Sequence, residues 1–165
     1  MGSGKSVIGK KLSEVLNYNY LDLDDYIQLK EDKTITDIFN GKGEIYFRKI
    51  ESNYLKEIID EKTTTVISLG GGTPCYSENM SKIKNAKNAS SIYLKTSIFV
   101  LSERLYSEKN HRPLIAHIQD KKELIEFIGK HMFERSPYYT QSDITIDTDQ
   151  KSIDEVIESI VLKLF

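Results

Sequence analysis

The first six residues, M-G-S-G-K-S, have the composition of a phosphate-binding loop. In such a loop Gly2, Ser3 and Gly4 would direct backbone N–H groups toward a phosphate. Lys5 would reach the β- and γ-phosphates, and the hydroxyl of Ser6 would bind Mg²⁺. A glycine-rich N-terminus without function is the alternative. The helical pattern that follows at once, with the positive end of its dipole at the loop, favours nucleotide-phosphate binding.

Acidic and apolar residues alternate from Tyr20 to Asp25, which is typical of a strand whose end carries carboxylates. Residues two apart on a strand point to one face, so Asp22 and Asp24 would address one cavity. One could hold Mg²⁺ through water, and the other could orient or deprotonate an attacking hydroxyl. Spacing alone favours this reading no more than a solvated strand end. Asp25 is expected in the first turn of a helix.

Three glycines, Gly70, Gly71 and Gly72, follow a β-branched, apolar run. They indicate either a turn that needs positive φ or a place where backbone approaches a ligand closely, and three in succession favour the second. Cys75 lies next to them, but no base is linked to it by any pattern. We expect Cys75 to be a small buried thiol.

Arginines at three places are candidates for binding an anion, although each alone is more often a surface residue. Arg112 lies beside Pro113 in a long polar loop, where a lid could carry its guanidinium onto a transferring phosphoryl group. Arg135 is expected near the end of a helix that stops near Pro137, where it could grip a carboxylate or phosphate through two hydrogen bonds. Arg48 lies in a predicted helix.

Helices and strands alternate along the whole chain. Hydrophobic periodicity and turn residues predict helices at about 7–16, 26–31, 34–39, 44–61, 78–85, 97–107, 120–134 and 152–164, and strands at about 20–25, 63–69, 91–94 and 144–146. This order predicts an α/β fold, a three-layer α/β/α arrangement with a parallel sheet and ligands at the carboxyl ends of the strands.

Composition excludes several classes of function. The 165 residues suit one domain, and 23 basic against 25 acidic residues, a net charge of −2, provide no field to gather nucleic acid or anionic lipid. We therefore expect no nucleic-acid and no membrane partner. One cysteine allows no internal disulfide, and the three histidines show no metal-ligand spacing, so we expect a cytoplasmic protein whose metal is the Mg²⁺ of a nucleotide.

Seven short motifs together resemble the shikimate kinase family, whose fold is that of nucleoside-monophosphate-kinase-like P-loop proteins. They occur in the family's order along almost the whole chain: M-G-S-G-K-S, L-D-L-D from Leu21, I-F at 38–39, F-R-K-I-E from Phe47, S-L-G-G-G from Ser68, R-P-L from Arg112 and E-R-S-P-Y-Y from Glu134. The resemblance implies transfer of the ATP γ-phosphoryl group to the 3-hydroxyl of shikimate, on the route to chorismate and aromatic amino acids.

Roles on the nucleotide side come from this resemblance. It implies that Lys5 binds phosphates and stabilises developing charge, and that Ser6 and Asp22 hold Mg²⁺. Arg112 would arrive with a lid formed by residues 108–119. Arg104 would lie near the adenine.

Roles on the shikimate side follow in the same way. Asp24 would contact the accepting hydroxyl and act as its base. Arg48 and Arg135 would clamp the shikimate carboxylate. The glycines at 70–72 would bring backbone against the substrate. Residues 24–62 would form the substrate-binding subregion of a single kinase domain spanning 1–165, which we expect to be a monomer.

The chain departs from the family pattern at two places. Val7 stands where a threonine is expected, and the first glycine of G-x-x-x-x-G-K-[ST] would lie two positions before Met1, after a buried central strand. Because loss of that strand would leave backbone groups unpaired, we expect that the native protein begins upstream. A gluconate-type P-loop kinase and a non-catalytic nucleotide-binding module are the alternative functions.

Overall fold

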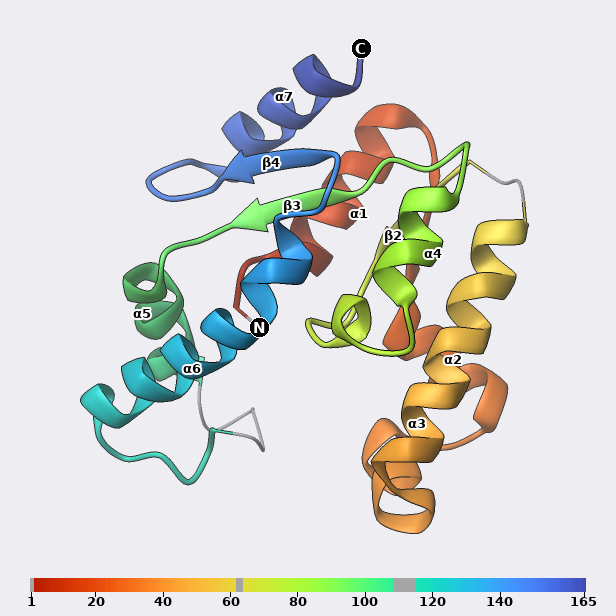
Figure 1. The fold of residues 1–165 in the computed structure, drawn as a ribbon. Coiled ribbons are helices and arrows are strands. Elements are labelled where there is room, and N and C mark those ends of the chain that lie inside the picture. The colour runs from red at the N-terminus through yellow and green to blue at the C-terminus, as the bar shows by residue number, and fades with distance from the viewer. Residues whose placement is uncertain (1, 62–63, 109–114) are drawn as a thin grey trace. The chain divides into compact units, whose positions relative to one another are not determined.

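The structure, a computed structural model, describes residues 2–61, 64–108 and 115–165. It divides into two compact units. We refer to Lys5–Ser91 as the N-terminal unit and to Met1–Gly4 with Ile92–Phe165 as the C-terminal unit (Figure 1). Each unit pairs two parallel strands and adds helices to them, which confirms the predicted α/β class. A single domain over 1–165 stays a prediction.

In the N-terminal unit a helix leads into a parallel strand pair. The elements are α1 (Lys5–Leu16), β1 (Asn19–Asp22), α2 (Leu23–Glu31), α3 (Ile35–Asp60), β2 (Thr65–Ser68), the short 3₁₀ helix η1 (Thr73–Cys75) and α4 (Asn79–Asn85). Strands β1 and β2 are in register from Asn19 opposite Thr65 to Asp22 opposite Ser68. The carboxyl ends of both strands therefore meet at one edge of the sheet.

Helix α1 packs directly on this strand pair because Gly9 has no side chain. A Cβ atom at Gly9 would lie 2.7 Å from Oγ of Ser68 and 2.9 Å from the ring of Tyr20. The apolar residues of this helix recur at helical spacing, and two of them, Ile8 and Leu12, are buried, whereas Val7 and Val15 are exposed.

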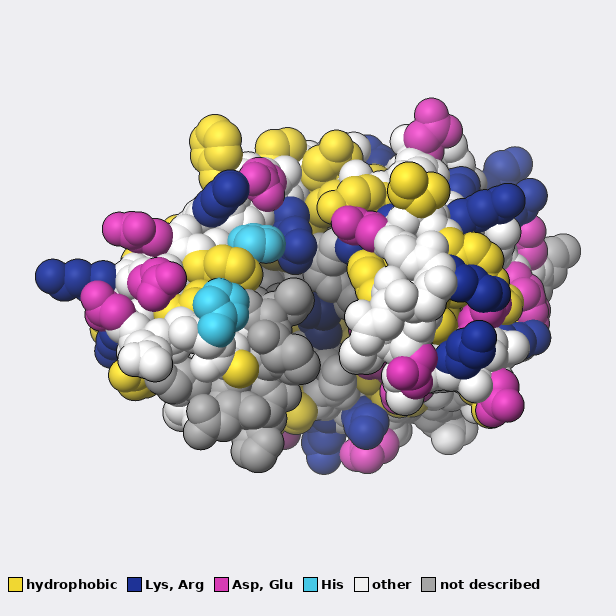
Figure 2. Space-filling view, turned by 90° about the horizontal axis from the view of Figure 1, so that it is seen from below, with side chains coloured by type: hydrophobic (Ala, Val, Ile, Leu, Met, Phe, Trp, Pro, Cys, Tyr) yellow, Lys and Arg dark blue, Asp and Glu magenta, His cyan; other side chains and the backbone are white. Residues whose placement is uncertain are grey.

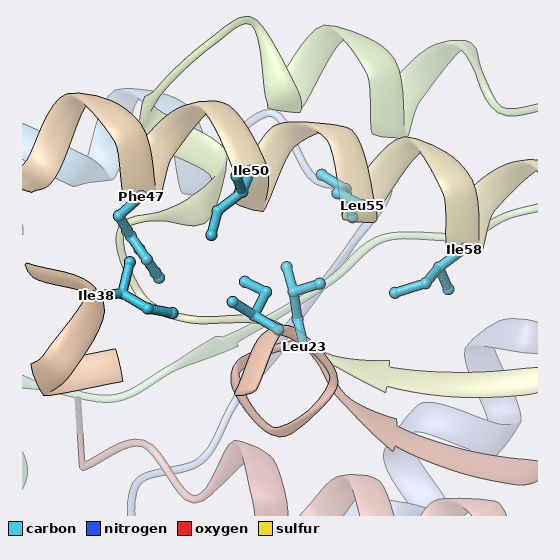
Figure 3. Close-up of a cluster of buried hydrophobic side chains, with 7 residues drawn as sticks. Leu23, Ile38, Phe47, Ile50, Leu55 and Ile58 are labelled. Carbon is cyan, nitrogen blue, oxygen red and sulfur yellow. The ribbon is translucent and has the colours of Figure 1, made fainter. Parts of the chain in front are cut away.

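The core of the N-terminal unit lies between α2 and α3. Figure 3 shows side chains of α3 pointing toward Leu23 of α2 and toward Ile38. The members of this cluster are Leu23, Ile27, Ile38, Phe47, Ile50, Leu55 and Ile58. At Gly43 (φ 79°, ψ 174°) the backbone leaves the helical region, so α3 consists of two helical segments, as the sequence predicts. Helical spacing places Ile45 in one apolar stripe with Ile50 and Ile58, but Ile45 is exposed, because it lies on the outer face beyond the kink.

The C-terminal unit contains the second strand pair. Its elements are β3 (Ile92–Lys95), α5 (Ile98–Glu108), α6 (Lys121–Tyr139), β4 (Ile144–Asp147) and α7 (Ile153–Leu164). Figure 1 shows β3 beside β4, with α7 along β4 and α6 along α5. The spacing of Ser152 and Glu155 predicts a capping box at the start of α7, and the structure contains it, because each side chain accepts from the other residue's backbone N–H group.

The end of α6 differs from the prediction. The helix continues through Pro137 to Tyr139 instead of stopping near Pro137. Proline removes one backbone donor, the one that would bond the carbonyl of Phe133, while the last carbonyls of any helix lack backbone donors and are open to side chains. Thr140 donates to the carbonyl of Ser136, and the amide of Gln141 donates to the carbonyl of Pro137. These side chains therefore cap carbonyls of the last turn, which extends the helix beyond Pro137.

The surface carries interspersed charges. On the face drawn in Figure 2, Lys and Arg side chains alternate with Asp and Glu side chains, so the described residues of that face form no large patch of one sign. Within the described ranges, no helix is long and apolar enough to cross a membrane.

Candidate active site

Three segments of the N-terminal unit converge where β1 and β2 end. The hydroxyl of Ser6, in the first turn of α1, lies 3.2 Å from Oδ2 of Asp22 and donates to it. The hydroxyl of Ser68, at the end of β2, donates to the carbonyl of Lys5 over 3.3 Å. The start of α1 is thus held against the carboxyl ends of both strands, where α/β proteins bind their ligands.

The two aspartates do not share a strand face, so that prediction was wrong. Asp22 is the last residue of β1 and the N-cap of α2, and its Oδ1 accepts from the backbone N–H of Asp24 at 3.1 Å. Asp24 is the second residue of α2, because the buried side chain of Leu23 begins the helix inside the core. Asp25 lies exposed in the same turn, as predicted.

Asp24 has an altered acidity. The pKa of its carboxyl is raised from 3.8 to about 6, chiefly by burial and also by the negative charges of Asp22 and Glu51, while the positive charge of Lys5 opposes the change. No hydrogen bond among the described residues ends on the Asp24 carboxylate oxygens. A carboxyl with these properties can take up a proton near neutral pH.

Arg48 is held by a buried carboxylate one turn further along α3. Its Nη1 donates to Oε2 of Glu51 over 2.9 Å, and its Nε is 3.4 Å from Oε1 of exposed Glu44. Glu51 is only 1% exposed. Burial lowers the pKa of Arg48, but the hydrogen bond and charge of Glu51 raise it by more, so the guanidinium stays charged. Arg48 therefore presents a fixed positive group.

The glycines after β2 are used for close approach and not for positive φ. The φ of Gly72 is −85°, and none of these three described glycines lies in the left-handed region. A Cβ at Gly72 would lie 3.0 Å from Nη2 of Arg48, and one at Gly70 would lie 3.4 Å from Oδ1 of Asp24. The backbone thus lies against the two charged groups of the candidate site. A turn that needs positive φ is therefore not what these glycines provide, and close approach of their backbone to a ligand stays a prediction.

In the C-terminal unit the start of the chain contacts α5. Gly2 and Gly4 have φ of 75° and 85°, values that favour glycine. Nη1 of Arg104 donates to the carbonyl of Gly2 over 3.4 Å, and a Cβ at Gly2 would lie 3.0 Å from the side chain of Leu105. Arg104 therefore lies next to the predicted phosphate loop.

For the other predicted site residues, Arg112 and Arg135, the structure describes less of their surroundings. Arg112 lies outside the described residues, as does much of the predicted lid loop. Of that loop's second half, Ile115 and Ile118 are buried in the hydrophobic core with α5 and α6. Arg135 is half-buried on α6, and its pairing with Arg48 stays a prediction.

Three residues of the arrangement were missed from the sequence. Glu51 could have been found, because it stands three positions after Arg48 on one helix and such pairs face each other. Thr73, whose hydroxyl donates to Glu51 at 2.7 Å, and Tyr76, whose ring covers Arg48, are brought to the site by the turn after the glycines. Sequence spacing holds no signal for them. Cys75 is half-buried, less than expected.

An acid-capped strand beside the start of a helix, with a carboxyl of raised pKa next to it, is the arrangement of a P-loop phosphotransferase. Such an enzyme moves a phosphoryl group between two substrates. A sequence model of the shikimate kinase family matches residues 1–165. The chain belongs to the shikimate kinase family, whose members use ATP with Mg²⁺ to phosphorylate a hydroxyl of shikimate.

Similar proteins support this membership. The shikimate kinase of Flavobacterium psychrophilum is 43% identical over 165 residues, which cover 100% of this chain and 95% of the relative. The shikimate kinase of Flavobacterium johnsoniae is 42% identical over 161 residues, covering 98% and 92% of the two chains.

Solved structures agree. The shikimate kinase of Bacteroides thetaiotaomicron matches with a TM-score of 0.87 at 31% identity, over 99% of this chain and 93% of the other. That of Acinetobacter baumannii, solved with shikimate, matches with a TM-score of 0.82 at 29% identity, over 99% and 88%. These neighbours confirm the predicted P-loop fold. A gluconokinase of Sinorhizobium meliloti, at 17% identity, TM-score 0.61 and coverage of 99% and 86%, shares the fold alone.

Proposed function

We propose that this chain transfers the γ-phosphoryl group of ATP to the 3-hydroxyl of shikimate, with Asp24 as the proton acceptor. The observation that carries the proposal is the place of the Asp24 carboxyl, which follows directly after the end of β1 where Asp22 bonds Ser6 of α1; burial there raises its pKa to about 6. At neutral pH this carboxyl is mostly ionised and still basic enough to accept a proton. The hydroxyl oxygen attacks the γ-phosphorus as its bond to the β–γ bridging oxygen breaks. The proton passes to Asp24 and ADP leaves.

Arginines orient the acceptor in this proposal. Arg48 and Arg135 bind the shikimate carboxylate, which fixes the ring so that its hydroxyl faces Asp24. The backbone at Gly70, Gly71 and Gly72 contacts the ring hydroxyls. Support comes from the space that Gly72 leaves for the Arg48 guanidinium. Residues 24–62 form most of this subregion.

The donor phosphates are bound by the start of the chain. Backbone N–H groups of Gly2, Ser3 and Gly4, together with the Lys5 ammonium, surround the β- and γ-phosphates. The positive φ values of Gly2 and Gly4 support this reading. Arg104 contacts the nucleotide, and Arg112 on the lid of residues 108–119 stabilises the transferring group.

Mg²⁺ fits the residues at the start of α1. The Ser6 hydroxyl and the Asp22 carboxylate, 3.2 Å apart, are oxygen ligands of the kind that Mg²⁺ prefers, and they would hold it, Asp22 through water. Among the described residues no group of three or more His, Cys, Asp or Glu side chains could hold a metal alone, so the nucleotide would supply further ligands. When bound, Mg²⁺ neutralises phosphate charge. We also propose that the protein acts as a monomer in the cytoplasm, where ATP is available.

An acceptor panel tests this function. ADP release is measured with ATP and Mg²⁺ in the presence of shikimate, gluconate, a nucleoside monophosphate or no acceptor. We expect release with shikimate alone, and loss of that release in Asp24→Asn. Equal release with gluconate would refute the assignment. Binding of ATP without any acceptor-dependent release would indicate a nucleotide-binding module.

A further inference from the structure

The turn after the glycines is fixed to α3 by buried polar groups. The Asn79 amide donates to the carbonyl of Thr73 over 2.9 Å, and the Ser52 hydroxyl donates to Oδ1 of Asn79 over 2.6 Å. Thr73 and Asn79 are fully buried, and Ser52 is nearly so. Lys82 also donates to Ser52 and to the carbonyl of Ser77. Buried groups that are all hydrogen-bonded hold a segment in one conformation.

This turn places Tyr76 over the face of the Arg48 guanidinium. The Cζ atom of Arg48 lies 4.1 Å from the centroid of the Tyr76 ring, within the range of a cation–π contact. Both residues line an open groove of about 570 Å³ on the N-terminal unit, and Tyr76 is 40% exposed. In the described part of the chain, the Tyr76 hydroxyl takes part in no hydrogen bond. The ring face is therefore its contribution.

The same turn fixes the edge of the guanidinium. Thr73 donates to Oε1 of Glu51 over 2.7 Å, which leaves Oε2 of Glu51 to accept from Nη1 of Arg48. The backbone of Gly72 lies against Nη2. Among described residues Nη2 donates to no hydrogen bond, so its two N–H groups are available to a ligand. The guanidinium is thus contacted on three sides: Glu51 binds Nη1, the Tyr76 ring covers one face, and the Gly72 backbone lies against Nη2.

We propose that Tyr76 and Thr73 are positioning residues that hold the Arg48 guanidinium in the orientation that binds the shikimate carboxylate. This inference rests on the proposed role of Arg48. An arginine side chain otherwise loses much rotamer freedom when it binds, so an arginine ordered beforehand binds its ligand more tightly. Neither positioning residue contacts the phosphoryl group. Their loss therefore raises the KM for shikimate and leaves kcat and the KM for ATP nearly unchanged.

Steady-state kinetics of Tyr76→Leu and Tyr76→Phe test the first residue. Leucine keeps an apolar side chain but has no aromatic face, and we expect a KM for shikimate raised about fivefold, as the loss of one cation–π contact implies. Phenylalanine keeps the face, so Tyr76→Phe should behave as the wild type. Tyr18→Leu is the matched control, because Tyr18 is 39% exposed on the same unit and lies in the turn between α1 and β1. It should leave both KM values unchanged.

Thr73→Val and Thr73→Ser test the second residue in the same assay. Valine has nearly the shape of threonine but leaves Oε1 of Glu51 without its donor, so the KM for shikimate should rise. Serine keeps the hydroxyl, so Thr73→Ser should have the KM for shikimate of the wild type. Thermal unfolding of each variant, measured alongside, should show that the KM rises without a matching loss of fold.

Three results would overturn the inference: a wild-type KM in Tyr76→Leu, a raised KM in Tyr76→Phe, or an equal rise in the KM for ATP. Arg48→Lys separates this inference from the proposed function. A raised KM for shikimate in Arg48→Lys together with a wild-type Tyr76→Leu would refute the positioning role alone. An unchanged KM in Arg48→Lys would refute the carboxylate-binding role of Arg48 and the inference with it.

Discussion

Replacing Asp24 by asparagine should stabilise the protein while removing its activity. Folding raises the pKa of this carboxyl from 3.8 to about 6, chiefly through burial, so ionised Asp24 opposes folding. The difference corresponds to about 3 kcal/mol, at about 1.4 kcal/mol for each tenfold change in proton affinity. Because the site is partly solvated, we expect about 1 to 3 kcal/mol. Asparagine keeps the shape and breaks no hydrogen bond of the side chain within the described residues.

The sign of the pH dependence follows from the direction of the change. The folded protein binds the Asp24 proton more tightly than the unfolded chain does, so the contribution to stability is complete below pH 3.8 and is lost as the pH rises through about 6. The free energy of unfolding of Asp24→Asn should therefore exceed that of the wild type by the largest amount at pH 8. The difference in unfolding free energy should fall by about half at pH 5.

Thermal and urea unfolding at pH 5 and pH 8 measure this effect. At pH 8 the variant should melt about 3 to 9 °C above the wild type, given the chain length. Asp25→Asn is the control, because that carboxylate is exposed in the same helical turn and favours the helix N-terminus. It should lose a little stability. Two results would refute the burial of an ionised carboxyl at this site. One is an Asp24→Asn protein that is less stable than the wild type at pH 8, and the other is a stability difference between variant and wild type that is the same at pH 5 and pH 8.

Three further changes test other parts of the account. Gly72→Ala places a Cβ 3.0 Å from Nη2 of Arg48 and should raise the KM for shikimate, with the KM for ATP unchanged; equal KM values would contradict the close approach. Ser6→Ala should raise the Mg²⁺ concentration needed for half-maximal activity, and an unchanged Mg²⁺ dependence would contradict the proposed role of Ser6 as a Mg²⁺ ligand. Leu55→Ala should cost about 2 to 5 kcal/mol in urea unfolding, because Leu55 is buried in the core; a cost below 1 kcal/mol would contradict that packing.

Local sequence signals predicted local structure well. The spacing of Ser152 and Glu155 predicts a capping box because both partners lie within one turn, and the box is present. The break at Gly43 is also local, since glycine adopts positive φ at little cost. The continuation of α6 through Pro137 to Tyr139 was not predicted; the side chains of Thr140 and Gln141 cap carbonyls of its last turn.

The candidate site needed more than local signals. Asp24 was recognised as chemically important, but its position was wrong, because the burial of Leu23 starts α2 one residue after the strand ends. Its raised pKa depends on burial and on Glu51, a residue 27 positions away in the chain. Tyr76 reaches Arg48 only through the buried hydrogen bonds of Asn79. Contacts of this kind are set by tertiary packing, which residue spacing does not encode.

The pH dependence of kcat/KM for shikimate tests the central claim most directly. If Asp24 accepts the proton from the shikimate hydroxyl, the wild-type value should rise with a slope of one as the pH approaches about 6 and then level off. In Asp24→Asn the value should be lower by about 100- to 10,000-fold and should lack this rise. An Asp24→Asn enzyme that keeps the wild-type rate, or the wild-type rise near pH 6, would contradict the account.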